Sequence, residues 1–386
     1  MPSRLAQRVA NFPPYPFAGL EKRVTEMTAA GKDVIRLDIG SPDQPPAPNI
    51  IQALDQSAQD PTHHGYAGYF GIPALRQAIA GYYLRRFDVQ LDPRNQVLPL
   101  IGSKEGIFNL ALAYVDPGET VLVPDPGYPT YTSGTLLAGG EVYRVPLIEK
   151  RSWLPDFSAI PHQACRCAKI LWLNYPNNPT TATASLDFFA EAIAFAREND
   201  ILLVHDNPYC DVCFDGYVAP SLLQVPGAKE VAIEFNSLSK SYNMGGWRVG
   251  MAVGNPEAIG VLSRLKTNID SGIFRAVQDA AVEALAGDQE WLSERNDTYA
   301  RRRDMVLRAL PSAGMSANTP RSTIYIWARI PSGFTSVDFC DQLLEKAYVS
   351  ITPGVVFGQQ GEGYVRISLG QTTQRVEEAM ERLRNL

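Results

Sequence analysis

The chain has 386 residues, which exceeds the usual size of one domain and indicates two or three domains. Its 45% hydrophobic and 20% charged residues are ordinary for a globular protein and exclude a disordered chain. A formal net charge of -6 disfavours nucleic-acid binding, and no apolar run reaches the roughly 20 residues of a membrane span. The N-terminus lacks a signal-peptide pattern, so we expect a cytoplasmic protein with reduced cysteines that acts on small molecules.

Two proline-rich segments, residues 11–17 and 41–48, come before the first regular pattern of the chain. Proline interrupts both helices and strands, so these segments are typical of an arm and a linker. We therefore expect residues 1–48 to form an N-terminal arm and part of a small domain.

Short apolar segments alternate with helical patterns between residues 96 and 253. The segments are VLPLI at 97, TVLVP at 120, EVYRV at 141, KILWLN at 169, ILLVH at 201, VAIEF at 231 and VGMAV at 249. Such strands, separated by helices, are typical of a parallel sheet covered on both faces. One of the helices is expected to begin after Ser185, which has the side chain of an N-cap. Residues 49–287 are thus predicted to form a large α/β domain.

The pattern changes after residue 287. A long charged helix is predicted near residues 293–310, followed by strands in STIYIWARI and YVRISL and by helices at 337–346 and 373–384. This mixture predicts a smaller α+β domain over residues 288–386.

Polar residues directly follow several of the predicted strands, where ligands of open parallel sheets bind. Ser103 and Lys104 stand at the start of a helix, where free N-H groups favour a phosphate. Neither GxxxxGK[ST] nor GxGxxG occurs at a strand end, so nucleoside triphosphates and dinucleotides are disfavoured. Asp206 and Tyr209 lie three positions apart on one loop, where they could bind a heteroaromatic ring. Lys240 follows a buried strand, which makes it a candidate for an amine with a lowered pKa.

A metal site is not expected. Cys165 and Cys167, with Cys210 and Cys213, could at most suggest zinc, but the first spacing is tighter than zinc ligands usually have. The histidines also lack a metal-binding spacing such as HExxH.

Taken together, these motifs resemble the class I aminotransferases, which are pyridoxal 5'-phosphate (PLP) enzymes of fold type I. The most specific part is SLSKSYNMGGWRVG, residues 237–250, and the resemblance covers nearly the whole chain. It implies a large domain with a mostly parallel seven-stranded sheet, a smaller α+β domain and PLP as cofactor. It also implies transfer of an amino group between an amino acid and a 2-keto acid.

The resemblance also implies roles for single residues around the cofactor. Lys240 matches the lysine that holds PLP as a Schiff base, and Asp206 matches the carboxylate that keeps the pyridine nitrogen protonated. Tyr209 and Asn178 match the donors to the ring's phenolic oxygen, and Tyr128 matches the aromatic residue that stacks on the ring. The cofactor phosphate is expected to be bound by Ser103, Lys104, Ser237, Ser239 and Arg248.

Other matched residues concern the substrate and the partner subunit. Arg366 and Gly40 match the groups that bind the substrate α-carboxylate, with Asn178 beside them, and Tyr15 matches an arm tyrosine near the substrate. Tyr66 matches a tyrosine that crosses to the phosphate of the neighbouring subunit. The resemblance therefore implies a homodimer with shared active sites.

The substrate is less closely defined by the sequence. NFPPYPFAGLEK, IGSKEG and DPGYPTY resemble a subgroup with LL-diaminopimelate, aspartate and alanine aminotransferases, but YAGYFG lacks the glutamate of the plant-type diaminopimelate enzymes. Glutamate and 2-oxoglutarate are the couple that the family implies. The sequence departs from the family at Thr181, where the Asn-Pro-Thr-Gly element usually has glycine.

Two other enzyme classes fit parts of the sequence. The same cofactor and fold also serve β-lyases, which release ammonia. Ser237 and Lys240 satisfy the S-x-x-K pattern of penicillin-recognising serine hydrolases, but the companion S-D-N and K-T-G elements are missing.

Overall fold

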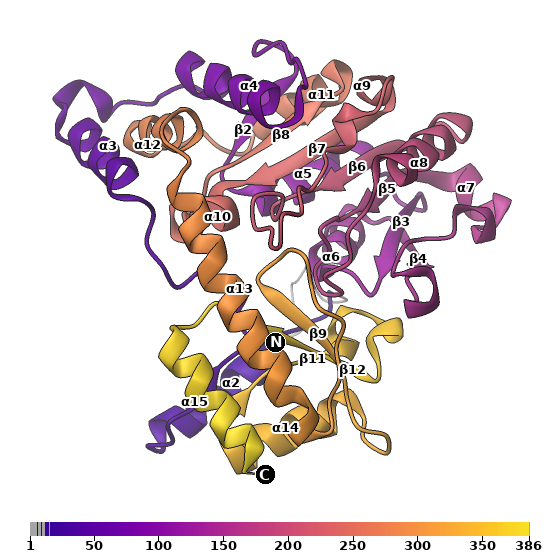
Figure 1. Ribbon diagram of the computed structural model, residues 1–386. Helices are drawn as coiled ribbons and strands as arrows, with labels where there is room; N and C mark the ends of the chain where they lie inside the picture. Colours follow the sequence, from indigo (N-terminus) through magenta and orange to yellow (C-terminus); the bar gives the residue numbers. More distant parts are fainter. Residues whose placement is uncertain (1–5, 7–8, 10–11, 15, 386) are drawn as a thin grey trace.

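A seven-stranded sheet forms the centre of the larger part of the molecule (Figure 1). The computed structural model describes residues 6, 9, 12–14 and 16–385. Its strands follow the order β2-β8-β7-β6-β5-β3-β4. They are β2 (Val97–Leu100), β3 (Thr120–Asp125), β4 (Glu141–Pro146), β5 (Ala168–Leu173), β6 (Leu202–Asp206), β7 (Ala232–Ser237) and β8 (Gly250–Gly254). All seven predicted strands are therefore confirmed.

Strand β8 differs from the parallel arrangement that the apolar segments predicted. It runs antiparallel to both of its neighbours, β2 and β7. The segment between β7 and β8 holds only a one-turn helix, α10 (Leu238–Ser241), and a 3-10 turn, so the chain reverses beside β7. The sheet is mostly parallel, with one antiparallel strand.

Helices cover both faces of this sheet because its strands are apolar on both sides. Val121 and Val123 of β3 belong to the apolar cluster on one face, and Leu122 between them belongs to the cluster on the other face. The first face is covered by α5 (Ser103–Tyr114), α6 (Pro129–Ala138) and α11 (Pro256–Lys266). The opposite face is covered by α3 (Pro48–Gln59), α4 (Pro73–Phe87), α8 (Leu186–Glu198) and α12 (Arg275–Ala286).

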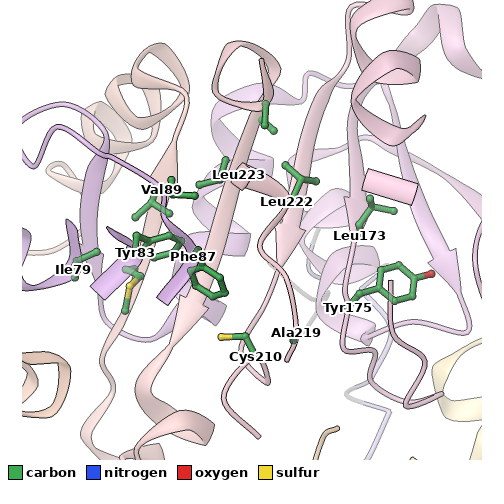
Figure 2. Close-up of a cluster of buried hydrophobic side chains, with 14 of the residues drawn as sticks. Ile79, Tyr83, Phe87, Val89, Leu173, Tyr175, Cys210, Ala219, Leu222 and Leu223 are labelled. Atoms are coloured by element: carbon green, nitrogen blue, oxygen red, sulfur yellow. The ribbon is translucent and has the colours of Figure 1, made fainter. Parts of the chain in front are cut away.

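Figure 2 shows part of the cluster on this second face, where Tyr83 and Phe87 lie near Val89 and Leu223. Two short helices, α7 (His162–Cys167) and α9 (Ala228–Val231), precede strands β5 and β7. Helix α8 begins as predicted, because Ser185 Oγ accepts a hydrogen bond from Phe188 N at 3.2 Å. The core of this part is thus built from both faces of one sheet.

A smaller α+β part has its own apolar cluster. Its strands are β1 (Ile35–Arg36), β9 (Tyr325–Arg329), β10 (Val349–Ser350), β11 (Thr352–Pro353) and β12 (Tyr364–Ser368). Its helices are α2 (Ala18–Ala29), α13 (Trp291–Ala309), α14 (Ser336–Ala347) and α15 (Thr373–Arg384). The predicted strands and helices after residue 287 are confirmed.

The N-terminal segment joins this smaller part. Strand β1 pairs in parallel with β10, and Ile35 and Leu37 belong to the same apolar cluster as residues of α13, α14 and α15. Helix α13 extends from the larger part into the smaller one (Figure 1). Among the residues that the structure describes, no helix combines the length and apolar character needed to cross a membrane.

Candidate active site

A cavity of about 410 Å³ brings together residues from both parts of the molecule. It lies where β5, β6 and β7 end and where α5 begins. Twelve of the fourteen residues singled out by the sequence line it. They are Gly40, Ser103, Lys104, Tyr128, Asn178, Asp206, Tyr209, Ser237, Ser239, Lys240, Arg248 and Arg366.

Lys240 presents an amine to this cavity from the short helix α10. Its side chain is partly exposed because it opens onto the cavity. Its Nζ donates a hydrogen bond to Gly40 O, and not to Ser237, its companion in the S-x-x-K pattern. Burial lowers the pKa of Lys240; Tyr325 opposes this, and the cationic Arg366 and Arg248 lower the pKa further. The site thus favours the neutral, nucleophilic form of this amine.

Asp206 ends strand β6 with one carboxylate oxygen bound and one without a partner. Its Oδ2 accepts a hydrogen bond from Tyr131 OH at 2.6 Å, while the buried Oδ1 has no hydrogen-bond partner. Asn174 Nδ2 fixes the backbone by donating to Asp206 O at 2.6 Å. Burial raises the pKa of Asp206 to about 6, against the opposing hydrogen bond from Tyr131. A positively charged ligand group at Oδ1 would satisfy this oxygen and keep the carboxylate ionised.

An anion-binding cradle lies at the start of α5. Gly102 has a φ of +73°, and a Cβ there would lie 2.2 Å from Arg248 Nη2, so only glycine allows this approach. Arg248 Nη1 donates to Ser239 Oγ at 3.4 Å. Burial, followed by the charge of Arg248, lowers the pKa of Lys104. Cationic side chains, hydroxyl groups and helix N-H groups converge here, as a phosphate dianion requires.

Arg366 is held rigidly on strand β12. Its Nη1 donates to Asn178 Oδ1 at 2.8 Å and its Nη2 donates to Asp38 O at 2.9 Å. Its guanidinium carbon lies 4.2 Å from the ring centroid of Tyr325 and 4.7 Å from that of Phe357. The buried Nε has no hydrogen-bond partner. A carboxylate is the ligand that best matches such a fixed, planar cation.

Tyr209 lies next to this arginine, and its hydroxyl is 3.2 Å from Tyr325 OH. A Cβ on Gly40 would lie 1.9 Å from the same Tyr325 hydroxyl, so glycine is required at that position. Tyr128 packs edge-on against Tyr131, with ring centroids 5.7 Å apart. These aromatic rings enclose the cavity around the amine and the acid.

Thr181 adopts a backbone conformation that favours glycine. Its φ is +62°, in the left-handed region, and its N-H donates to Asn177 O at 2.9 Å. A β-branched residue is strained there by about 1–2 kcal/mol. The departure from the family therefore leaves the turn in place at some cost in stability.

Two of the predicted residues do not line the cavity. Tyr66 is 91% exposed, as expected for a residue that would act in a neighbouring subunit, although nothing in one chain tests that role. Tyr15 lies outside the described residues.

Tyr131, Tyr325 and Asn174 were not predicted from the sequence as site residues. Tyr131 follows Tyr128 in the same DPGYPTY motif, so its place in the first turn of α6 was an available signal. Tyr325 gave no local signal, because it reaches the cavity from β9 of the smaller part. Glu21, Arg36 and Asp38 also line the cavity and were not predicted.

The arrangement fits PLP on independent grounds. The unpartnered Oδ1 of Asp206 matches the pyridine nitrogen, and the cradle of Arg248, Ser239 and α5 matches the phosphate. The amine of Lys240 lines the same cavity as both. An aldehyde cofactor with a ring nitrogen and a phosphate meets a complementary group at each of its three functional ends.

The comparisons agree with this geometry. Residues 32–383 match the family described as aminotransferase class I and II. The LL-diaminopimelate aminotransferase of Moorella thermoacetica is 51% identical over 99% of this chain and 98% of its own length. The substrate-bound BacF structure from Bacillus subtilis has a TM-score of 0.96 at 37% identity, covering 99% of this chain and 98% of that one. The aspartate aminotransferase of Thermus thermophilus with maleate has a TM-score of 0.90 at 29% identity, covering 99% of each chain. The chain therefore belongs to the class I and II aminotransferases and is a PLP-dependent aminotransferase of fold type I.

Proposed function

We propose that Lys240, Asp206 and Arg366 are the three groups on which amino transfer by this enzyme depends. The observation that supports this is their common cavity, with an amine of lowered pKa, an unpartnered carboxylate oxygen and a fixed guanidinium. When bound, PLP supplies an electron sink for the charge that develops at the substrate α-carbon. Lys240 Nζ carries the proton of that carbon as general base and acid.

The other residues of the cavity orient the reactants. Arg366 binds the α-carboxylate through its two-pronged guanidinium. Asp206 keeps a proton on the ring nitrogen, and Tyr131 holds the carboxylate in place at 2.6 Å. Tyr209 and Asn178 donate to the phenolic oxygen of the ring. The role of Asn178 is supported by its contact with Arg366: the amide oxygen accepts from Arg366, so the NH₂ group is left to donate to the ligand.

The remaining cavity residues would hold the cofactor's flat face and its phosphate. Tyr128 stacks on the ring, and Gly40 offers its backbone to the substrate carboxylate. The phosphate is bound by Ser103, Lys104, Ser237, Ser239 and Arg248, all of which line the cavity. Tyr15, which lies outside the described residues, is proposed as a further contact to the substrate.

The amino donor that we propose is an L-amino acid of the LL-diaminopimelate type, with 2-oxoglutarate as acceptor. The support is the relative of 51% identity named as an LL-diaminopimelate aminotransferase. Aspartate and alanine remain alternatives, since a structural neighbour of 29% identity is named as an aspartate aminotransferase. A β-lyase would be recognised by pyruvate and ammonia among its products, whereas transfer gives a keto acid without free ammonia.

We also propose a homodimer with shared active sites, in which Tyr66 reaches the neighbouring phosphate. Large apolar side chains are exposed around Tyr66 and in a second segment beside it. This patch consists of Tyr66, Tyr69, Phe70, Ile269 and Phe274. The segments adjoin, because a Cβ on Gly272 would lie 2.4 Å from Gly68 O. Exposed apolar patches of this kind are typical of interfaces.

The domain limits that we propose are residues 49–287 for the large domain, with residues 1–48 and 288–386 completing the small one. Most of one apolar cluster comes from Ile35, Leu37 and residues between 299 and 383, which supports this division, and Tyr209, Val212 and Phe214 of the large domain pack against it. A cytoplasmic location is supported by the five cysteines, all of which are free thiols.

Replacement of Lys240 by alanine tests the proposal. We expect Lys240→Ala to lose the absorbance of the covalently bound cofactor and to lower turnover by about a thousandfold or more. Lys229→Ala, which removes a half-buried lysine of α9 that donates to Gln90 O and does not line the cavity, is the matched control. Transamination by Lys240→Ala at close to the wild-type rate would show that another group carries the proton.

A further inference from the structure

Three charged side chains that the functions proposed above do not use also line the cavity. Arg36 Nη2 donates to Asp38 Oδ2 at 2.7 Å and to Glu21 Oε2 at 2.6 Å, and its Nε donates to Asp38 Oδ1 at 2.9 Å. Asp38 is 5% exposed and Arg36 18%, whereas Glu21 on α2 is 59% exposed. The three residues form a cluster that is buried at one end and open to solvent and ligand at the other.

This cluster carries one net negative charge. Hydrogen bonds from Arg36 lower the pKa of Glu21, and those to Asp38 and Glu21 raise the pKa of Arg36, so these two groups stay ionised at neutral pH. Arg36 alone balances two carboxylates. Among the described residues that line the cavity, the other charges are Lys104, Asp206, Lys240, Arg248 and Arg366. The functions proposed above already use all five.

The cluster is also adjacent to the substrate. Arg366, which would hold the α-carboxylate, donates to the backbone oxygen of Asp38 at 2.9 Å. Asp38 therefore contacts Arg366 through its backbone oxygen and Arg36 through its carboxylate. The side chain of a substrate bound at Arg366 therefore extends into a cavity that the cluster also lines.

We infer that Glu21, Arg36 and Asp38 form a subsite that selects an amino donor with a positively charged ammonium group at the far end of its side chain. Glu21 accepts from this ammonium, since its exposed carboxylate has lone pairs that Arg36 does not use. Arg36 and the buried Asp38 hold Glu21 in position. A donor with only a carboxylate at that end meets a net negative charge and is disfavoured.

An isolated surface ion pair would not give this selection, because exposed pairs contribute little and hold no fixed geometry. Here the central guanidinium and Asp38 are largely buried, and all three residues line the substrate cavity. The inference rests on the proposed function, because it takes Arg366 as the α-carboxylate clamp.

Two donors of equal length provide the test. LL-2,6-Diaminopimelate carries the distal ammonium and L-2-aminopimelate lacks it, while both carry the distal carboxylate. Each is mixed with the PLP-loaded enzyme, and the first half-reaction is followed by the absorbance of the bound cofactor, with L-alanine as a short donor. We expect wild-type kcat/KM for diaminopimelate to exceed that for 2-aminopimelate by about tenfold or more.

The variant Glu21→Gln keeps the shape of the side chain and removes its charge. We expect it to reduce the ratio of the two kcat/KM values to about twofold, because the amide oxygen lacks the negative charge that attracts the ammonium. Glu26→Gln is the matched control, since Glu26 lies on the same helix, is 62% exposed and, in the described part of the chain, forms an ion pair with Lys22 alone. It should leave the ratio at the wild-type value.

The outcomes separate the two proposals. If none of the three donors changes the cofactor absorbance of the wild type, the proposed function fails. If donors react but the wild-type kcat/KM values for diaminopimelate and 2-aminopimelate are equal, the subsite proposal is wrong. This outcome does not depend on whether the variant folds. An unchanged ratio in Glu21→Gln also overturns it.

Discussion

Asp206 is subject to two opposing effects in this site. Its burial favours the protonated form and raises its pKa to about 6, whereas the role proposed for it beside a ring nitrogen requires the ionised form. The Tyr131 hydrogen bond at 2.6 Å partly offsets burial, and Oδ1 has no partner among the described residues. The site is therefore organised to receive a cationic group, whose charge would restore the ionised carboxylate.

A pH dependence of stability follows for the cofactor-free protein. The folded-state pKa of Asp206 is about 6 and its ordinary value is 3.8, so the folded state binds more protons between these pH values. Stability from this residue is therefore lost as pH rises from about 4 to about 6, by about 3 kcal/mol in total. Asp206→Asn lacks this titration. We expect urea denaturation to show that the unfolding free energy of wild type minus that of the variant falls by about 2 kcal/mol between pH 4.5 and 7.5, since part of the total is already lost at pH 4.5. An equal difference at both pH values would contradict the assignment.

The residues that the sequence identified share a local signal. Lys240 and Asp206 stand at or just after the end of a predicted strand, so their motif and the parallel sheet together placed them at one edge. Tyr325 had no such signal, because its hydroxyl meets Tyr209 only after residues 116 positions apart come together. Arg36 and Asp38 gave none either, since their function depends on which side of a short extended segment faces the cavity.

At the scale of elements, helix α13 contacts the segment that carries Lys240. Its Arg295 is 2% exposed and donates to the carbonyl oxygens of Ser241, Lys240 at 3.2 Å and Asp211 at 2.6 Å. Two of these carbonyls belong to α10, whose C-terminal oxygens have few partners of their own. Burial lowers the pKa of Arg295, and Asp211 opposes this effect. One side chain thus fixes the segment that carries the amine and the loop that follows the acid.

The sequence predicted α13 as a helix but did not reveal the burial of its charges. Arg295, Arg302 and Arg303 are at most 4% exposed, although their charged pattern is typical of a solvated face. Each is buried because it meets carbonyl or carboxylate oxygens from distant segments, such as Asp43 for Arg302 at 2.7 Å. The hydrophobic periodicity of the helix itself cannot predict partners that come from distant segments.

Replacement of Arg295 should therefore affect both stability and the amine. We expect Arg295→Met to lower the unfolding free energy by about 3 kcal/mol, because three carbonyl groups lose their donor. The pH at which the absorbance of the bound cofactor titrates should also shift, because Lys240 is no longer held. Arg295→Lys should recover only part of both effects, since one ammonium cannot reproduce the planar fork. Loss of stability without any change in the absorbance titration would limit Arg295 to a structural role.

At the scale of the whole molecule, the cavity closes between two separate cores. The large part supplies Lys240 and Asp206, and the smaller part supplies Arg366 and Tyr325. The alternating strands and helices could be read from sequence because burial on both faces imposes a strong apolar pattern. The contact between the two parts could not, because its apolar members, such as Trp153 against Trp327 and Tyr364, and its polar pairs come from segments far apart in the sequence. A third contribution, from a second subunit, is proposed through Tyr66.

A mixing experiment tests the shared site directly. If Tyr66 acts on the neighbouring phosphate, Tyr66→Ala and Lys240→Ala subunits are each defective in a different half of the same site. A mixed dimer then has one site with both residues intact and one site with neither. Random reassociation of equal amounts places half of the subunits in mixed dimers, so activity should recover to about one quarter of the wild-type value. Activity that stays at the sum of the two separate variants would mean that Tyr66 serves its own chain or none, and wild-type activity of Tyr66→Ala alone would remove it from the site.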